Sequence, residues 1–218
     1  MDSLTNMMLN YVLKQCEYHF PDGITPDKTE AHSIISQGLS ELKTCFSYLR
    51  DPYFSGDFLK TFNYLNGDHY SMFLYKISHI SFLKFNNVNF SEKLFQLNRS
   101  LHGIDAFYKI KLPPVFQFAH PLGTILGGAE FGNFFCVHQG CTIGNKEAGG
   151  YPSFGEGVIL FSGASIIGKS KIGNNVVFGA GSRQIDGNVA DNTLVLGQHP
   201  DNKYIDVNME YFEKLFIR

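Results

Sequence analysis

The chain has 218 residues, a formal net charge of −2 and a pI near 6.4. This length can bury the core of one large domain or two small ones without disulfides. The balanced charge disfavours nucleic acid or anionic lipid as a partner, because both select a dense lysine and arginine field. No apolar run approaches the ~20 residues of a membrane span, and Asp2 stands where a secretory signal carries positive charge. We therefore expect a cytoplasmic protein without a membrane span.

The first 104 residues carry the spacing of amphipathic helices. Apolar residues recur at steps of three and four within residues 4–16 and 31–49, which predicts two helices with one apolar face each. Residues 57–85 read as helical at both ends, and Gly67 separates the two helices. We expect an α-helical N-terminal domain over residues 1–104. The four cysteines lack metal-ligand spacing, so free, mostly buried thiols and no metal site are expected.

The second half of the chain has a six-residue period. Every sixth residue from Phe154 is apolar, which gives the series Phe154, Leu160, Ile166, Ile172 and Phe178. A hairpin sheet alternates every two residues, whereas a six-residue repeat indicates short stacked units that bury a continuous column. Each unit makes one strand and a turn, and three units close a triangular coil of 18 residues. This pattern predicts a β-helix over residues 105–200, followed by a tail over residues 201–218.

The repeat resembles that of the hexapeptide-repeat acyltransferases. More narrowly, "EGVILFSGASIIGKSKIGNNVVFGAGS" resembles the C-terminal coils of serine acetyltransferases without a gap, and "HPLGTILGGAEFGNFFCVHQGCTIGN" resembles their catalytic coil. "RDPYFSGDFLKTFNYLNGDHYSMFLYKISH" is similar to part of their N-terminal domain, so the likeness covers about residues 50 to 200. It implies an all-β left-handed parallel β-helix with an N-terminal α-helical domain, and acyl transfer as the activity. Some β-helix proteins have other activities, so the repeat alone does not prove an enzyme.

The resemblance implies catalytic roles for His120 and Asp105. Acyl transfer to a hydroxyl needs a base, and histidine titrates near neutral pH. His120 occupies the position of the family's catalytic histidine, and Asp105 precedes it by the spacing of the carboxylate that orients it. A separation near one coil should bring the two side chains together, with Asp105 fixing the tautomer of His120. The alternative is a histidine that caps a coil corner.

The family implies acetyl-CoA as co-substrate, bound in a groove between coils of neighbouring subunits. Small residues there allow the pantetheine arm to approach the backbone, and cations meet its phosphates. The candidate coenzyme residues are Gly144, Ser162, Gly163, Ala180 and Arg183, with Lys169 and Lys171 as further cations that could equally be solvated surface. A shared groove implies a homotrimer or a dimer of trimers.

The acceptor site departs from the family pattern. Asp51 matches the aspartate of the family's Arg-Asp-Pro, but Ala119 replaces a second aspartate before the catalytic histidine. Gly150 and Tyr151 stand where an Arg-His pair is expected, so a free amino acid loses countercharges. "HPLG" followed by "QGCTIG" and "YP" resembles the serine-acetyltransferase-like enzymes associated with bacterial surface sugars, and this resemblance implies a hydroxyl of a sugar or surface-polysaccharide precursor as the acceptor. The candidate acceptor residues are Asp51, His138 and Tyr151, with Tyr64 and Tyr70 as further rings for a pyranose.

Two alternatives stay open. One is serine O-acetylation, L-serine to O-acetylserine, in cysteine biosynthesis, which Ala119 opposes. The other is a nonenzymatic β-helix assembly subunit, which the His120 and Asp105 pair opposes. For His138, packing within the coil is the alternative to a substrate contact, and for His69 a structural role in a helix is favoured.

Overall fold

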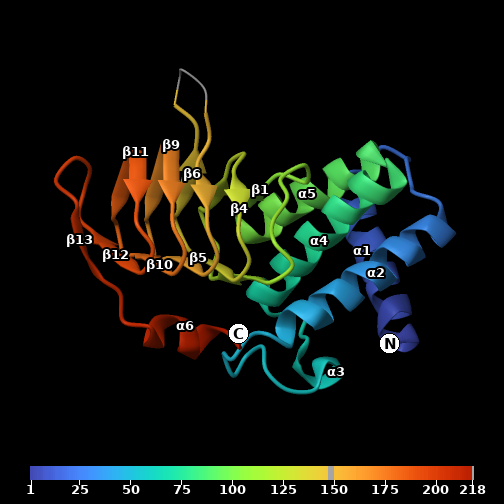
Figure 1. Cartoon of the computed structure of the whole chain (residues 1–218). Helices are drawn as coiled ribbons and strands as arrows, with labels where there is room; N and C mark the ends of the chain where they lie inside the picture. Colours follow the sequence, from blue (N-terminus) through green and yellow to red (C-terminus); the bar gives the residue numbers. More distant parts are fainter. Residues whose placement is uncertain (147–149, 218) are drawn as a thin grey trace.

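The computed structural model describes residues 1–146 and 150–217, and it joins a group of helices to a stack of short strands (Figure 1). The helices come first in the chain. They are α1 (Asp2–His19), α2 (Lys28–Phe46), α3 (Phe58–Thr61), α4 (Gly67–Phe85) and α5 (Val88–His102). The two helices predicted near residues 4–16 and 31–49 correspond to α1 and α2. Gly67 begins α4, as its predicted place between two helices requires, whereas α5 had no separate prediction.

Side-chain caps define where the longer helices begin. The Asp27 carboxylate accepts from the backbone N–H groups of Thr29 and Glu30 at the start of α2. Asn66 does the same for α4, accepting from the N–H groups of Asp68 and His69. Such caps satisfy backbone donors that have no partner inside the helix. The cap at Asn66 fixes the first turn of α4, and with it the position of Asp68.

The strands form two sheets, which are parallel except where β13 pairs antiparallel with β12. One sheet orders its strands β1-β3-β6-β9-β7-β4, with β11 beside β9, and the other orders them β13-β12-β10-β8-β5-β2. Val158 pairs with Val176 one eighteen-residue coil later, as the hexapeptide repeat predicts. The fold is thus the predicted left-handed β-helix with an N-terminal helical region. The strands are β1 (Asp105–Ala106), β2 (Phe116–Ala119), β3 (Ile125–Leu126), β4 (Glu130–Phe131), β5 (Phe135–His138), β6 (Thr142–Gly144), β7 (Ser153–Phe154), β8 (Val158–Leu160), β9 (Ser165–Ile172), β10 (Val176–Phe178), β11 (Arg183–Val189), β12 (Thr193–Leu196) and β13 (Lys203–Asp206).

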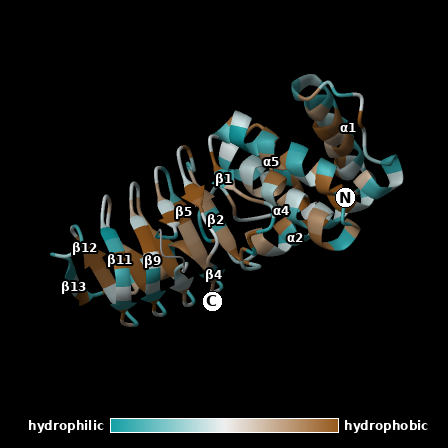
Figure 2. Cartoon of the chain, turned by 90° about the horizontal axis from the view of Figure 1, so that it is seen from above, coloured by the Kyte–Doolittle hydropathy of each residue, from teal (hydrophilic) through white to brown (hydrophobic). Residues whose placement is uncertain are grey.

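The six-residue series forms the core of the β-helix. Leu160, Ile166 and Phe178 are fully buried, and Phe154 and Ile172 are each only 5% exposed. Figure 2 shows the strands of the β-helix coloured predominantly as hydrophobic, while the helices alternate hydrophobic and hydrophilic residues. The core continues into the helical part through β2, whose Phe116 and Phe118 rings lie within 6.3 Å of the Tyr75 ring of α4. The four cysteines are free and buried, as expected.

One corner of the β-helix is built on stacked glycines. Gly123, Gly140, Gly163 and Gly181 have φ angles between +68° and +72°, a left-handed conformation that costs other residues free energy. An added Cβ at Gly140 would lie 3.7 Å from the backbone of Gly163, so successive turns are in close contact there. This stacked edge begins beside His120.

The C-terminal segment returns along the β-helix to the helical region (Figure 1). After β13 pairs antiparallel with β12, the chain forms α6 (Glu210–Leu215). Tyr211 then lies against Phe161, with ring centroids 5.8 Å apart, and the Ile217 N–H donates to the Tyr48 carbonyl at 2.8 Å. The predicted tail is therefore folded onto the body of the chain.

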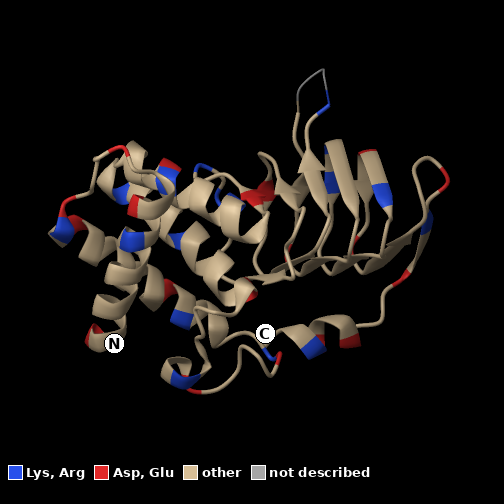
Figure 3. Ribbon diagram, turned by 180° about the vertical axis from the view of Figure 1, so that it is seen from behind, with Lys and Arg blue, Asp and Glu red and all other residues tan. Residues whose placement is uncertain are grey.

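Charged residues are scattered, as the balanced composition implies. Figure 3 shows Lys and Arg interspersed with Asp and Glu over the helices, and few charges on the strands. Within the described residues, no helix combines the length and apolar character that crossing a membrane requires.

Candidate active site

His120 lies at a corner of the first coil, directly after β2. Its backbone has φ +51°, and its side chain is 79% exposed in the single chain. It opens onto a hollow of about 540 Å³ between the helical region and the coil. The described residues that line the hollow are Tyr53, Asn66, Gly67, Asp68, Leu101, His102, His120, Pro121 and Leu122.

Asp68 of α4 makes two contacts with His120. One carboxylate oxygen accepts from the His120 backbone N–H at 3.0 Å. The other lies 3.6 Å from His120 Nδ1. Asp68 is two residues after the cap Asn66, so the capped start of α4 presents this carboxylate to the coil corner. A carboxylate at Nδ1 orients an imidazole and stabilises its protonated form.

A second carboxylate, Asp51, lies close to Asp68. Burial is the main cause that raises the pKa of Asp68, His120 partly opposes it, and the negative charge of Asp51 raises it further. Asp51 accepts from the Tyr53 N–H at 2.9 Å and from Gln117 Nε2 at 3.4 Å. Gln117 is only 2% exposed, and its side-chain oxygen has no hydrogen-bond partner among the residues that the structure describes. Two neighbouring carboxylates favour a positively charged group between them.

Asp105 does not contact His120 within the single chain, so its expected pairing with His120 stays a prediction. Its carboxylate lies 3.5 Å from Arg99 Nε, and among the described residues only Asp68 forms an ion pair with His120. The two residues lie in different sheets, since Asp105 pairs with Ile125 of β3 whereas His120 follows β2. The chain between β1 and β2 contains no regular strand. The expectation that a separation near one coil brings Asp105 and His120 together therefore does not apply to this segment.

His138 is the neighbour of His120 on the next coil. It pairs in register with Ala119, the residue before His120, and its ring centroid is 5.0 Å from that of Phe161. Burial first, and the charge of His120 second, lower the pKa of His138. A histidine held neutral in this way packs against Phe161 and lies beside the candidate base. The sequence left both a packing role and a substrate contact open for His138, and the geometry is compatible with both.

The tyrosines expected at the acceptor site are elsewhere. Tyr70 is 2% exposed, bonds to Gln15 and packs among the helices, so its burial excludes a sugar contact. Tyr64 packs against Tyr11 in a tilted arrangement, with ring centroids 4.9 Å apart. Tyr151 lies against Gly128 and lines a different hollow, together with Asp105. Of the acceptor candidates, Asp51 and His138 lie near His120, whereas Tyr151 belongs to a separate surface of the same chain.

The coenzyme candidates divide between one corner and one sheet. Ser162 and Gly163 occupy the corner after β8, and Ala180 precedes Gly181, so all three belong to the glycine-stacked edge that begins beside His120. Gly144 and Arg183 lie in the other sheet, where β6 and β11 flank β9. Arg183 and the further candidates Lys169 and Lys171 are exposed. The described residues hold no group of three His, Cys, Asp or Glu side chains that could bind a metal ion.

His69 has a structural place, as favoured from the sequence. It is 2% exposed, and its Nδ1 accepts from the Asn63 N–H at 3.2 Å among the rings of Phe46, Phe54 and Phe62. The residue before it, Asp68, makes the contact with His120. Sequence reasoning missed both Asp68 and Gln117, although Asp68 directly precedes His69 in the stretch that resembles the family's N-terminal domain.

Comparison with known proteins agrees with this architecture. No family model matches the chain. The serine acetyltransferase of Synechococcus elongatus is 31% identical over 106 residues, which are 47% of this chain and 43% of that protein, so the match spans less than half of the relative.

Solved structures cover more of the chain. The crystal structure of serine acetyltransferase from Vibrio cholerae covers 92% of this chain and 79% of its own, with a TM-score of 0.69 at 18% identity. A serine acetyltransferase in complex with CoA covers 90% and 83%, with a TM-score of 0.65 at 18% identity. This chain is therefore a hexapeptide-repeat protein with the serine acetyltransferase fold, and nearly half of it is serine acetyltransferase-like in sequence.

Proposed function

We propose that the protein is an acetyl-CoA-dependent O-acetyltransferase of the serine acetyltransferase type, with His120 as general base. The fold and the sequence likeness of the β-helix support the reaction class, and a structural neighbour in complex with CoA supports the co-substrate. The observation that carries the proposal is the exposed His120 imidazole with Asp68 at its Nδ1, at the mouth of a hollow. A nonenzymatic subunit has no need of this arrangement.

The proposed reaction proceeds by direct transfer. The imidazole of His120 takes the proton of the acceptor hydroxyl while the hydroxyl oxygen attacks the thioester carbonyl carbon. The bond from that carbon to sulfur then breaks, and the leaving CoA thiolate takes the proton from the imidazolium. Asp68 stabilises the imidazolium between these steps. The products are the acetyl ester and CoA.

The proposed coenzyme path follows the glycine-stacked edge. Ser162, Gly163 and Ala180 have small side chains, so a pantetheine arm can approach the backbone beside His120. The nucleotide end of the coenzyme has four candidate contacts on the adjoining sheet, namely Gly144, Lys169, Lys171 and Arg183. A neighbouring subunit of a trimer would cover the exposed face of His120 and complete the groove.

L-Serine is the acceptor that the charges favour. Its ammonium group is attracted by Asp68, which contacts His120, and by Asp51, whose charge acts on Asp68. Asp68 thereby supplies a carboxylate that Ala119 lacks. The relatives of similar sequence are serine acetyltransferases as well. Ala119 therefore no longer argues against serine as the acceptor, because Asp68 of α4 supplies the negative charge that is missing at position 119.

A sugar hydroxyl is the second candidate. The described residues that line the His120 hollow include no lysine or arginine for the carboxylate of an amino acid. Burial lowers the pKa of His102, which also lines the hollow, to about 4, so its ring is neutral near pH 7. A neutral saccharide requires no such cation.

An acceptor panel distinguishes the two candidates. Release of the CoA thiol from acetyl-CoA is measured with L-serine, with N-acetylserine, and with a set of nucleotide sugars and free sugars. We expect turnover with L-serine, weaker turnover with N-acetylserine, which lacks the ammonium, and background rates with sugars. Turnover with a sugar alone would replace the serine proposal, and no turnover with any hydroxyl compound would refute O-acetylation.

A further inference from the structure

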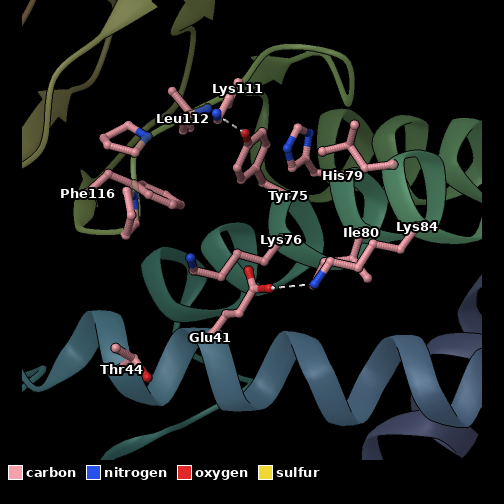
Figure 4. Close-up of a pocket in the computed structure, with 13 residues that line it drawn as sticks. Glu41, Thr44, Tyr75, Lys76, His79, Ile80, Lys84, Lys111, Leu112 and Phe116 are labelled. Carbon is pink, nitrogen blue, oxygen red and sulfur yellow. Dashed lines mark hydrogen bonds and ion pairs between the residues drawn. The ribbon is translucent and has the colours of Figure 1, made fainter.

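A second cavity lies on the helical side of the molecule, away from His120. It occupies about 360 Å³ between α2, α4 and the segment before β2 (Figure 4). This volume is in the range of small-molecule sites. Apolar side chains make most of its wall, namely Ile80, Leu83, Leu112, Pro113, Pro114 and Phe116.

The wall of this cavity is held in a fixed shape. The Tyr75 hydroxyl donates to the Ile110 carbonyl at 2.6 Å and accepts from the Leu112 N–H at 2.8 Å. His79 Nδ1 lies 2.7 Å from the Tyr108 carbonyl oxygen. Both side chains of α4 therefore bind the chain that leads into β2. These hydrogen bonds fix the shape of the cavity at the contact between the helical region and the first coil.

Lys76 places an ammonium group inside this apolar cavity. The residue is only 5% exposed, and its side chain extends into the space between α2 and Phe116 (Figure 4). Its Nζ lies 5.0 Å from the centre of the Phe116 ring. Among the described residues, Nζ has no hydrogen bond and no carboxylate within 4.0 Å. The nearest acidic candidate, Glu41, instead pairs with Lys84 at 3.6 Å and accepts from Gln37 at 3.0 Å.

A buried ammonium with no carboxylate in contact is costly, so the site favours an anion. Burial is the main cause that lowers the pKa of Lys76, and the charges of Cys45 and Glu41 only partly oppose it. The lining carries three lysines, Lys76, Lys84 and Lys111, against the single carboxylate of Glu41. A phosphate or another hydrophilic anion would leave the apolar wall without a partner, whereas a carboxylate on an apolar body satisfies both parts of the site.

We propose that this cavity binds an amphiphilic monocarboxylate, with the carboxylate on Lys76 and the apolar chain against Phe116 and Leu112. The site is independent of the acyl transfer proposed at His120, and its ligand belongs to the class of medium-chain or aryl-alkyl carboxylic acids.

Binding of octanoate tests this assignment, with 1-octanol as the uncharged ligand of equal chain length. Calorimetry gives the affinity, and backbone amide NMR shifts give the location. We expect saturable octanoate binding with shifts at Ile80 and Leu112, and an affinity for 1-octanol that is lower by about tenfold or more, because a charge-assisted hydrogen bond is lost. Lys76→Met should weaken octanoate by a similar factor, whereas Lys14→Met, an exposed site on α1, should not change it.

Three results would overturn the proposal. They are the absence of saturable octanoate binding, equal affinity for octanoate and 1-octanol, and unchanged octanoate affinity in folded Lys76→Met. The comparison of the two ligands uses the unmodified protein, so it decides the question even if the Lys76 variant fails to fold. Because acetyl transfer is not the readout, failure here leaves the proposed function untouched.

Discussion

Within the single chain, Asp68 occupies the place beside His120 that the sequence predicts for Asp105. Asp68 contacts both the backbone N–H and Nδ1 of His120, whereas Asp105 pairs with Arg99. An asparagine at position 68 keeps an oxygen that accepts from the His120 N–H but loses the negative charge. That change isolates the electrostatic part of the contact from its structural part.

Asp68→Asn should raise the KM for L-serine and lower kcat, with a combined loss of about tenfold or more in kcat/KM. Asp105→Asn is the matched control and should leave the KM for L-serine within a small factor of its original value. Steady-state thiol release with both variants measures the difference. A larger loss for Asp105→Asn than for Asp68→Asn would return the orienting role to Asp105.

His69 makes stability depend on pH. Burial lowers its pKa to about 4, whereas an unfolded histidine titrates near 6.5, so the unfolded chain binds more protons between these values. The stabilisation is complete above about pH 6.5 and is lost as pH falls toward 4, by about 3 kcal/mol from this residue.

Urea unfolding at pH 7 and pH 4 measures that contribution. In His69→Gln the difference in unfolding free energy between the two pH values should be smaller than in the unmodified protein by about that amount. An equal pH dependence in both proteins would mean that His69 is not held neutral in the fold.

At the scale of the elements, α2 and α4 pack so closely that a glycine is required between them. A Cβ at Gly38 would lie 2.3 Å from Ile77 Cγ2 of α4, nearer than side chains approach in real contacts. Helix propensity alone favours alanine over glycine by about 1 kcal/mol. Overpacking of a core costs about 1–3 kcal/mol, and we expect it to outweigh the propensity gain.

Gly38→Ala should therefore lower the free energy of unfolding, by about 1 kcal/mol after the propensity gain is subtracted. Ser40→Ala, two residues later on the exposed side of α2, is the control and should change stability by no more than about 0.5 kcal/mol. Denaturant unfolding of both variants checks the order. A stabilised Gly38→Ala protein would show that α4 moves away at little cost.

The same elements show which parts of the structure could be predicted from the sequence. The six-residue apolar series predicts the β-helix and its core because period and burial have one cause, the stacking of identical coils. The contact of Asp68 with His120 joins residues 52 positions apart through the docking of α4 on a coil corner, and no local pattern encodes that docking. Asp105 was assigned from the resemblance to serine acetyltransferases. The expectation that it lies beside His120 assumed a regular coil, which residues 107–115 do not form.

At the scale of the whole molecule, the single chain leaves the candidate site open. The His120 side chain is 79% exposed, and the neighbouring apolar residues Leu122 and Ile125 are 65% and 48% exposed. A groove closed by a second subunit would cover such a surface, and flat β-helix faces suit a closed ring. We expect a trimer, or two trimers joined through the helical regions.

Light scattering at micromolar concentration should give a mass of three or six chains, each of 24.5 kDa. The result should not change on dilution within that range. A stable species with the mass of one chain would contradict both the trimer and a coenzyme groove shared between subunits.

Single-turnover acetyl transfer by His120→Ala tests the central proposal most directly. Removal of a positioned base costs about 10² to 10⁴ in rate. Binding of CoA should persist, and at a hundredfold excess over its dissociation constant CoA should still stabilise the variant by about 2.7 kcal/mol in thermal unfolding. For His120→Ala we therefore predict both results, the loss of rate and the retained binding of CoA. His138→Ala should act mainly on acceptor affinity. A His120→Ala protein that binds CoA and transfers acetyl at a near-normal rate would contradict the assignment of His120 as the base.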